Sequence, residues 1–555
     1  MGENTVGERV RVVTKEGPVI GSLEERDGKN LYSFYRVPYG TPPLGQLRFS
    51  APKPAAPWQE DIDCTKKVCG PVTGAELVTK CCLLNEDCLY VHIVTRDLNP
   101  VKPKPVMFWI GCFNYCWSLN ILLEPCILVD EDVVFVTCSF RAGPMGFLSI
   151  QNVVAPGNAG LKDIVMGLKW VQRNISLFGG DPNNVTLFGS STGGAIVHLM
   201  MLSSMTEGLF HKAIIQSASA LNNWALTKNP AAAVVELAKA LGIEVIGNDY
   251  AEIVEILKTL PAEDIVKAFL DKIAVVEDAT DIFNPMFRPC IEEDFEGHTA
   301  FLSKSPFLIL KSGKFNKVPM IIGGDNIETS LLKFLKYNFS ENYEQLNQRS
   351  SFTLPKQMAS GMNSLSTKLV QQLINFYTGE DAELSDGTKH QYLQMISDYY
   401  FLYCVNKSVR FHARWAAESP VYYYVLNFSG DWSVPHELCY MNCGEIPYMF
   451  QIRLPAEDRY ARGGRDSVRV RSRVIKMWTN FAKYGNPTPD DNDPLFHITW
   501  DPVENEDRLN YLAIGTELTK GRNPYYDRMK FWDQLFVEQS FLRTLMYFND
   551  MGVQW

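Results

Sequence analysis

The chain has 555 residues, of which 46% are hydrophobic, and its formal net charge is −10. This composition can supply a large buried core, whereas an acidic surface repels phosphate backbones and so argues against a nucleic-acid partner. The most apolar stretch, residues 119–138, is interrupted by several acidic residues and by Pro125, so no membrane span is expected.

From the N-terminus onward, charged side chains such as Glu3, Glu8 and Arg11 follow one another with no apolar run between them. This pattern predicts no secretory signal peptide. For the chain as given, we therefore expect a cytoplasmic location.

Short apolar runs then recur between longer helical patterns. Buried strands are predicted at residues 106–110, 133–138, 185–188, 213–215, 320–322 and 421–426. Helices are predicted at residues 159–178, 231–241, 391–415 and 467–484. Strands that alternate with helices form a mostly parallel central sheet with helices on both faces, so the predicted class is α/β. Because no tandem repeat or long polar linker is found, we expect a single domain over residues 1–555.

A glycine-rich turn joins the predicted strand 185–188 to the helical segment behind it. The turn reads Gly189, Ser190, Ser191, Thr192 and Gly193. This is the G-x-S-x-G pattern in the strand–turn–helix context that makes it meaningful. The turn would hold Ser191 above the sheet, at a helix N-terminus whose dipole stabilises developing negative charge. We predict that Ser191 is a catalytic nucleophile, with a chance glycine-rich turn as the alternative.

Five further motifs are spread along almost the whole chain. They are FYRVPYGTPPLGQLRF at 34–49, EDCLY at 86–90, GNAGLKD at 157–163, FGGDPNNVTLFG at 178–189 and WTNFAKYGNP at 478–487. Together they resemble the type-B carboxylesterases, the group that includes the cholinesterases and, most similar to this chain, the insect α-esterases. The resemblance implies an α/β-hydrolase fold and hydrolysis of carboxylic esters by a serine nucleophile through an acyl-enzyme.

The resemblance also implies a catalytic triad in the chain order Ser, Glu, His. Ser191 occupies the nucleophile position. Glu328, just after the predicted strand 320–322, occupies the acid position. Thr329 replaces the glycine that the family usually has after this acid, which is a modest departure.

The base position differs more severely from the family. The run EIPYMF at 445–450 sets the register, and in that register Asn442 stands where the family has its histidine. An asparagine amide cannot accept a proton near neutral pH, so it cannot activate Ser191. His436 lies six residues upstream and could substitute only if its loop were rerouted.

The oxyanion loop of the resembled family, His-Gly-Gly-(Gly or Ala)-Phe, is altered as well. If Phe113 is the family's phenylalanine, two residues are deleted and only Gly111 and Cys112 remain. The N–H of Thr192 is left as a donor beside the nucleophile, and Ser190 replaces the acidic residue that usually precedes it. Losing one oxyanion donor lowers turnover by about 10²–10³-fold, and losing the base lowers it on the order of 10⁶-fold. We therefore expect impaired catalysis.

Several interpretations stay open. The chain is an ester hydrolase that is impaired, or one that has rebuilt its base from His436 and its oxyanion hole from Gly111, Cys112 and Thr192. Alternatively, it binds or sequesters esters or other apolar ligands without catalysis. A slow acyl trap at Ser191 lies between these, and an adhesion module like the neuroligin-type relatives ranks last. The expected partner is a small apolar ester or another hydrophobic ligand.

No cofactor or metal ion is expected. The 13 cysteines form no CxxC pair and no other metal-ligand spacing. No glycine fingerprint for a mononucleotide or dinucleotide phosphate is present either.

Overall fold

A computed structural model shows the fold over most of the chain. It describes residues 7–66, 85–116, 120, 123–247, 250–274, 285–326, 365–379, 385–415, 417–432, 444–454, 459–460, 462–490 and 492–538.

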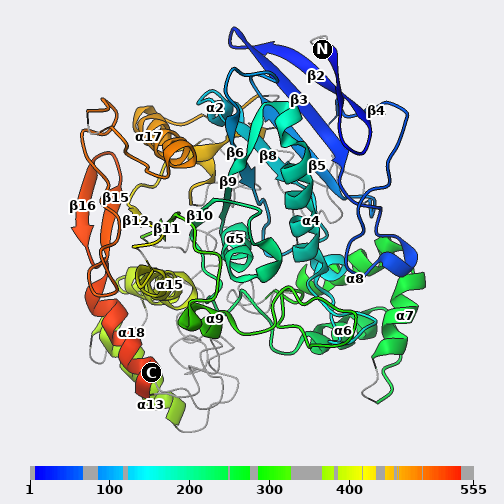
Figure 1. The fold of residues 1–555 in the computed structure, drawn as a ribbon. Coiled ribbons are helices and arrows are strands. Elements are labelled where there is room, and N and C mark those ends of the chain that lie inside the picture. The colour runs from blue at the N-terminus through cyan, green and yellow to red at the C-terminus, as the bar shows by residue number, and fades with distance from the viewer. Residues whose placement is uncertain are drawn as a thin grey trace.

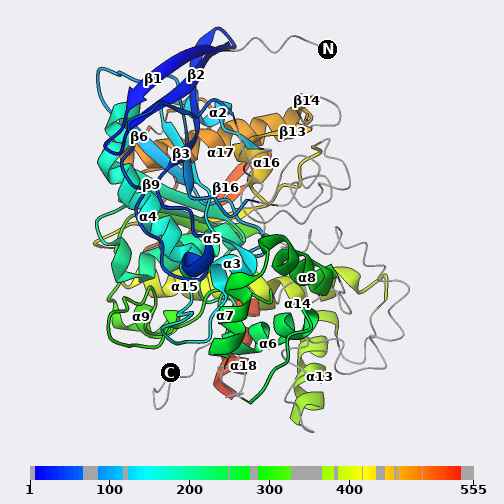
Figure 2. The ribbon, with the colours of Figure 1, turned by 90° about the vertical axis from the view of Figure 1, so that its right-hand side faces the viewer.

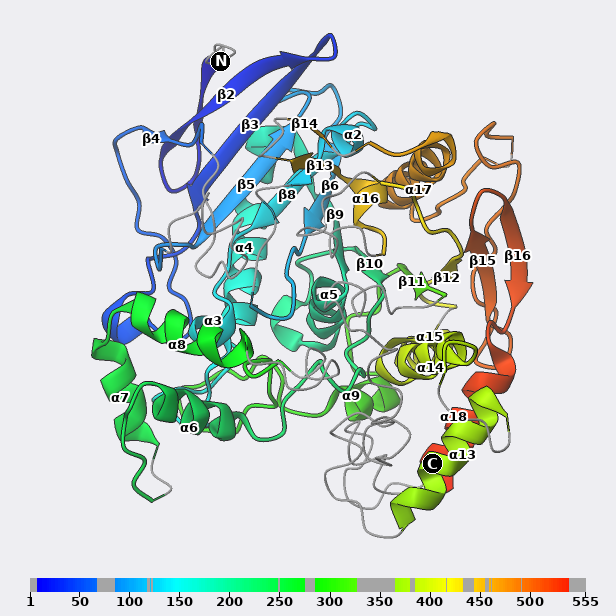
Figure 3. The same ribbon diagram turned by 180° about the vertical axis from the view of Figure 1, so that it is seen from behind.

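The described residues form a 13-stranded sheet with the order β1-β2-β3-β5-β8-β6-β9-β10-β11-β12-β15-β16, and β4 pairs with β2. From β8 to β15 every pairing is parallel. Toward both ends the pairings are antiparallel, apart from the parallel pairing of β4 with β2. The bounds are β1 Glu8–Val13, β2 Pro18–Arg26, β3 Lys29–Pro38, β4 Ile62–Asp63, β5 Tyr90–Thr95, β6 Lys104–Trp109, β8 Val134–Cys138, β9 Gly180–Ser190, β10 Lys212–Gln216, β11 Met320–Asp325, β12 Val421–Leu426, β15 Asn510–Ile514 and β16 Leu518–Arg522. A small second sheet contains β7 Leu123–Glu124, β13 Gln451–Leu454 and β14 Arg459–Tyr460. Figure 3 shows the two edges of the large sheet, with β2 and β4 on one side and β15 and β16 on the other.

Helices surround the large sheet (Figure 1). Their bounds are α2 Cys126–Val129, α3 Gly143–Phe147, α4 Ala159–Asn174, α5 Thr192–Leu202, α6 Pro230–Ala240, α7 Ala251–Thr259, α8 Ala262–Ala274, α9 Pro306–Ser312, α13 Leu365–Thr378, α14 Lys389–Ser397, α15 Tyr403–Ala413, α16 Ile446–Met449, α17 Arg465–Tyr484 and α18 Tyr526–Glu538. Figure 2 shows α6, α7, α13 and α18 gathered in the half of the molecule away from the N-terminal strands.

Alternating side chains of the strands divide the interior into two cores. In β6, Val106 and Phe108 belong to one core, whereas Met107 and Trp109 belong to the other. Successive residues of a strand point to opposite faces of the sheet, which produces this division. Buried residues of α4, α5 and α15 pack in the first core, and Trp478 with its neighbours in α17 packs in the second. The predicted α/β class, with a mostly parallel sheet covered on both faces, is confirmed.

All the predicted strands and helices are present, but two of the helices are not regular throughout. The end of the predicted helix 159–178, Ile175–Phe178, is a 3₁₀ helix that follows α4. The second irregular helix is the segment 391–415. This segment is not one regular helix, because a π-helical turn, Asp398–Leu402, separates α14 from α15. The antiparallel strands near both termini were not predicted. β1 and β16, at the edges of the sheet, are only partly buried, so they lack the continuous apolar run that marks a central parallel strand. β5 is buried, but His92 interrupts its apolar run.

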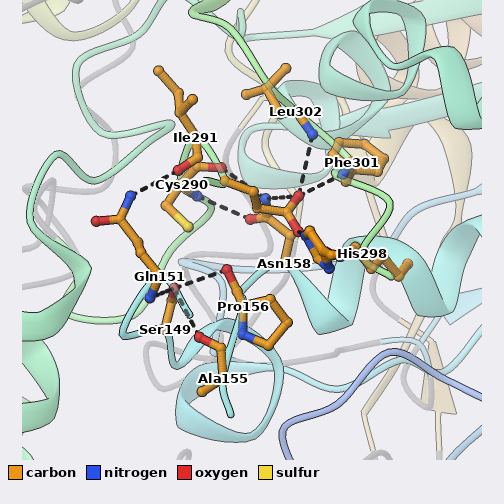
Figure 4. Close-up of polar contacts among 12 residues, drawn as sticks. Ser149, Gln151, Ala155, Pro156, Asn158, Cys290, Ile291, His298, Phe301 and Leu302 are labelled. Atoms are coloured by element: carbon orange, nitrogen blue, oxygen red, sulfur yellow. Dashed lines mark hydrogen bonds and ion pairs between the residues drawn. The ribbon is translucent and has the colours of Figure 1, made fainter. Parts of the chain in front are cut away.

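A buried carboxylate ties the beginning of α4 to a distant loop (Figure 4). Glu292 Oε1 accepts from Lys162 Nζ at 2.5 Å and lies 3.0 Å from His298 Nε2. Its Oε2 accepts from Asn158 Nδ2 at 2.9 Å and from the N–H of Phe301 at 2.6 Å. A buried charge is tolerated when it is paired and hydrogen-bonded in this way. The contacts anchor α4, which packs on β9, the strand that leads to Ser191.

Candidate active site around Ser191

Ser191 stands between β9, which ends at Ser190, and α5, which begins at Thr192. Its backbone has φ 52° and ψ −121°, a conformation that costs a residue with a side chain on the order of 1–3 kcal/mol. The Ser191 N–H donates to the carbonyl of Gln216 at 2.8 Å, and the Ser191 carbonyl accepts from the N–H of Ala195 at 2.9 Å. The surrounding backbone therefore holds the strained turn in place, in the strand–turn–helix context that the sequence predicted.

Two glycines allow the backbone segments of the turn to approach one another. A Cβ atom on Gly189 would lie 2.6 Å from the carbonyl carbon of Gly193. A Cβ atom on Gly193 would overlap the carbonyl oxygen of Ile110, at the end of β6. Any side chain at either position would thus push the turn away from α5 or from the neighbouring strand.

The predicted oxyanion loop contacts the first turn of α5. The N–H of Asn114 donates to Thr192 Oγ1 at 3.0 Å, and a Cβ atom on Gly193 would lie 3.8 Å from the backbone nitrogen of Cys112. A Cβ atom on Gly111 would overlap the side-chain amide of Asn120. The structure therefore brings the Gly111–Cys112 turn and Thr192 together beside Ser191.

The same loop contains backbone strain that was not predicted from the sequence. Asn114 and Tyr115 both have positive φ angles, 52° and 58°. The Tyr115 carbonyl accepts from the N–H of Gly143 at 2.7 Å, and its hydroxyl donates to the carbonyl of Ala225 at 3.0 Å. A left-handed backbone costs a residue with a Cβ atom roughly 1–2 kcal/mol, and the contacts of Asn114 and Tyr115 hold it in place.

Cys112 brings a thiol close to the elbow. Burial raises the pKa of this thiol to about 12. A thiol with such a pKa is almost entirely protonated at neutral pH and is a poor nucleophile. Ser191 therefore remains the candidate nucleophile of the site.

A buried carboxyl group next to the elbow was missed in the sequence. Glu445 Oε2 accepts from Ser190 Oγ at 3.1 Å, and its Oε1 accepts from Ser217 Oγ at 2.9 Å and from the Tyr424 hydroxyl. Burial raises the pKa of Glu445, while the hydroxyl donors act in the opposite direction. The available signal was Ser190 itself, because a hydroxyl buried in place of the usual acid needs a hydrogen-bond partner.

Three predicted site residues lie outside the described residues: Glu328, His436 and Asn442. Their predicted roles therefore stay predictions. The segment next to Asn442 does reach the elbow, and it also meets the end of β11, which precedes Glu328. A Cβ atom on Gly444 would lie 3.8 Å from Ser190 Oγ and 3.9 Å from Asp325 Oδ2, at the end of β11. Among the described residues, the hydroxyl of Ser191 has no hydrogen-bond partner.

The described ranges contain neither a metal-binding group nor a membrane-spanning helix. Within them, no three His, Cys, Asp or Glu side chains are grouped so that they could hold a metal ion. No helix there combines the length and the apolar character that crossing a bilayer would require.

Comparison with known proteins gives consistent matches over nearly the whole chain. A model of the carboxylesterase family matches residues 8–532. Juvenile hormone esterase of Tribolium castaneum is 29% identical, with 98% of this chain and 95% of the relative covered. Esterase FE4 of Myzus persicae is 32% identical over 76% of this chain and 74% of the relative.

Among solved structures, the crystal structure of juvenile hormone esterase from Manduca sexta, with OTFP covalently attached, superimposes with a TM-score of 0.79. It is 26% identical, and the match covers 96% of this chain and all of that one (100%). This match and the family model confirm the predicted α/β-hydrolase fold.

Proposed function

Because the chain belongs to the carboxylesterase family, whose members include the esterases described above, we propose that it is a carboxylic-ester hydrolase by descent whose turnover is impaired. The expected ligand is a small apolar ester. Ser191 can be acylated only slowly, and the acyl group is released inefficiently.

One observation carries this proposal: an intact elbow combined with asparagine at the base position. The turn at Ser191 has the strained backbone and the α5 N-terminus that ester hydrolysis uses. Asn442 stands where the family has its histidine. Glu445, three residues after Asn442, accepts a hydrogen bond from Ser190. This contact puts the start of the EIPYMF run beside the elbow, which supports the register that aligns Asn442 with that histidine.

The chemical consequence concerns proton transfer. The Ser191 hydroxyl must lose a proton as it attacks the ester carbonyl, and the leaving alkoxide must gain one. The Asn442 amide can do neither near neutral pH. Removing such a base lowers turnover on the order of 10⁶-fold, while oxyanion donors and binding retain about 10³–10⁴-fold acceleration over water. The N–H of Thr192 and the α5 dipole support that residual activity.

A second candidate function is binding or sequestration of esters or other apolar ligands without turnover. The strained, shortened loop at Asn114 and Tyr115 favours it, because this loop differs from the glycine-rich donor loop that the family uses. The asparagine at position 442 and the altered loop both concern the chemical step, and neither changes the scaffold.

The test is hydrolysis of a short-chain nitrophenyl ester by purified protein. We expect a rate close to that of the Ser191→Ala variant, no further loss in His436→Ala, and a gain of at least about 10²-fold in Asn442→His. A rate well above Ser191→Ala that disappears in His436→Ala would show instead that His436 has become the base. A gain in Asn442→His that does not depend on Ser191 would also contradict the proposal.

Covalent capture separates the slow trap from pure binding. OTFP, which is covalently attached in the Manduca sexta esterase structure, is a suitable probe, and intact-mass spectrometry measures the adduct. An adduct that forms slowly and is absent in Ser191→Ala supports the trap. Reversible binding with no adduct after prolonged incubation supports sequestration.

A further inference from the structure

A cavity of about 820 Å³ lies between α15, α18 and the end of β16. Figure 1 shows α15 beside α5, with α18 and β16 on the other side of α15. None of the residues that line the cavity belongs to the turn at 189–193 or to the loop at 111–115. In the sheet, β10, β11 and β12 separate β9 from β15. The cavity therefore does not belong to the site at the elbow. Its volume falls within the range of about 300–1,000 Å³ that is common for small-molecule sites.

Apolar side chains contribute to its lining. Phe411 comes from α15, Leu509 precedes β15, and Met529 comes from α18. All three are buried. A ligand that contacts these side chains gains from burying a hydrocarbon portion of its own.

Charged side chains also line the cavity. They are the cations Lys407, Arg410, Arg414, Arg522 and Lys530 and the carboxylates Glu506, Asp507 and Asp533. The five cations exceed the three carboxylates by two, although the whole chain has a net charge of −10. A concave region whose charge opposes that of the whole protein concentrates anions.

Three of the cations lie along one face of α15 and its C-terminal cap, because Lys407, Arg410 and the cap residue Arg414 are three and four residues apart. Asp533 pairs with Lys407 at 3.2 Å and with Arg410, and Glu506 pairs with Arg414 at 2.6 Å. Burial lowers the pKa of Lys407, Asp533 raises it, and the nearby arginines lower it further. Asp533 and Glu506 therefore hold these three side chains in place along the wall of the cavity.

The two remaining cations have weaker partners. Arg522 Nε donates to Asn510 Oδ1 at 3.3 Å, and its guanidinium lies 3.9 Å from Glu504 Oε2. Lys530 lies 5.9 Å from the centre of the Tyr526 ring, and no carboxylate of the described residues lies within 4.0 Å of its ammonium. Both side chains are exposed and can turn toward a ligand at little cost.

We propose that this cavity is a second ligand site, which binds a small amphipathic anion such as an alkyl carboxylate. The hydrocarbon chain packs on Phe411, Leu509 and Met529, and the headgroup binds Arg522 and Lys530. A guanidinium suits this role because it donates two parallel hydrogen bonds to a carboxylate. The site does not depend on turnover at Ser191.

The test is calorimetric titration of the full chain with decanoate, with decanol as the uncharged comparison. The double variant Arg522→Gln/Lys530→Gln removes the proposed headgroup contacts. The matched control, Lys239→Gln/Lys520→Gln, changes the net charge equally at exposed lysines that pair elsewhere, with Glu236 and Asp501.

We expect saturable decanoate binding that weakens with salt, at least about tenfold weaker binding in Arg522→Gln/Lys530→Gln, and less than about twofold change in the control. Decanol should bind more weakly than decanoate. The absence of saturable decanoate binding would overturn the proposal. So would equal affinity in all three proteins, because decanoate would then bind elsewhere, or equal losses in both variants, because only overall charge would then matter.

Discussion

Replacing Asp398 by asparagine should change how the stability of the protein depends on pH. Asp398 lies in the π-helical turn between α14 and α15 and is fully buried. The Tyr377 hydroxyl donates to its Oδ2 at 2.5 Å, and Arg528 Nε lies 3.3 Å from the same oxygen. Burial raises the pKa of Asp398 from 3.8 to about 6, although Arg528 and Tyr377 act to lower it.

The size and sign of the effect follow from this pKa. A shift of roughly two pKa units corresponds to about 3 kcal/mol. Because the folded protein holds this proton more tightly than the unfolded chain, the stabilisation is complete below about pH 4 and is lost as the pH rises through about 6. Asp398→Asn cannot ionise. Between pH 4 and pH 7.5, the wild type should therefore lose about 3 kcal/mol of unfolding free energy that the variant keeps. The difference between the two proteins should shift in favour of the variant by that amount.

The assay is urea-induced unfolding, followed by tryptophan fluorescence at a series of pH values. Asp527→Asn is the control, because this exposed carboxyl lies on α18 beside Arg528. Its difference from wild type should vary little with pH. The reasoning is refuted if the difference between Asp398→Asn and wild type is constant over this range, or if it moves in the opposite direction.

Three further predictions concern the site. Gly193→Ala should lower the free energy of unfolding by at least about 2 kcal/mol in chemical denaturation, since its Cβ would overlap the Ile110 carbonyl. The control Gly167→Ala has room for a Cβ inside α4 and should not destabilise the protein. Similar losses in both variants would refute the steric argument. Glu445→Ala should destabilise the protein more than Glu445→Gln, because alanine leaves the buried hydroxyls of Ser190, Ser217 and Tyr424 without their acceptor. Each such hydroxyl costs about 1–3 kcal/mol. Equal unfolding midpoints of the two variants would contradict the hydrogen-bond assignment. Cys112, with its pKa of about 12, should resist iodoacetamide at neutral pH in peptide mapping by mass spectrometry, and rapid labelling of the folded protein would contradict the raised pKa.

The amino-acid sequence alone determined the local and periodic features of this protein. The predicted strand at 421–426 matches β12 residue for residue, because a buried parallel strand is a continuous apolar run that can be recognised without its neighbours. The turn around Ser191 is equally local, since closely spaced glycines and a serine define it. The asparagine at position 442 is likewise a fact of sequence, and the register with the family makes it meaningful.

Only the tertiary structure decided which distant residues meet. Ser190 and Glu445 are 255 residues apart, and no periodicity in the chain links a hydroxyl to a carboxyl over that distance. The left-handed backbone at Asn114 also depends on contacts, since the loop after β6 must fit against Thr192. The cavity beside α15 likewise joins residues of separate segments. Local sequence sets backbone preferences and apolar faces, whereas the packing of those faces sets the pairs of polar groups that are buried together.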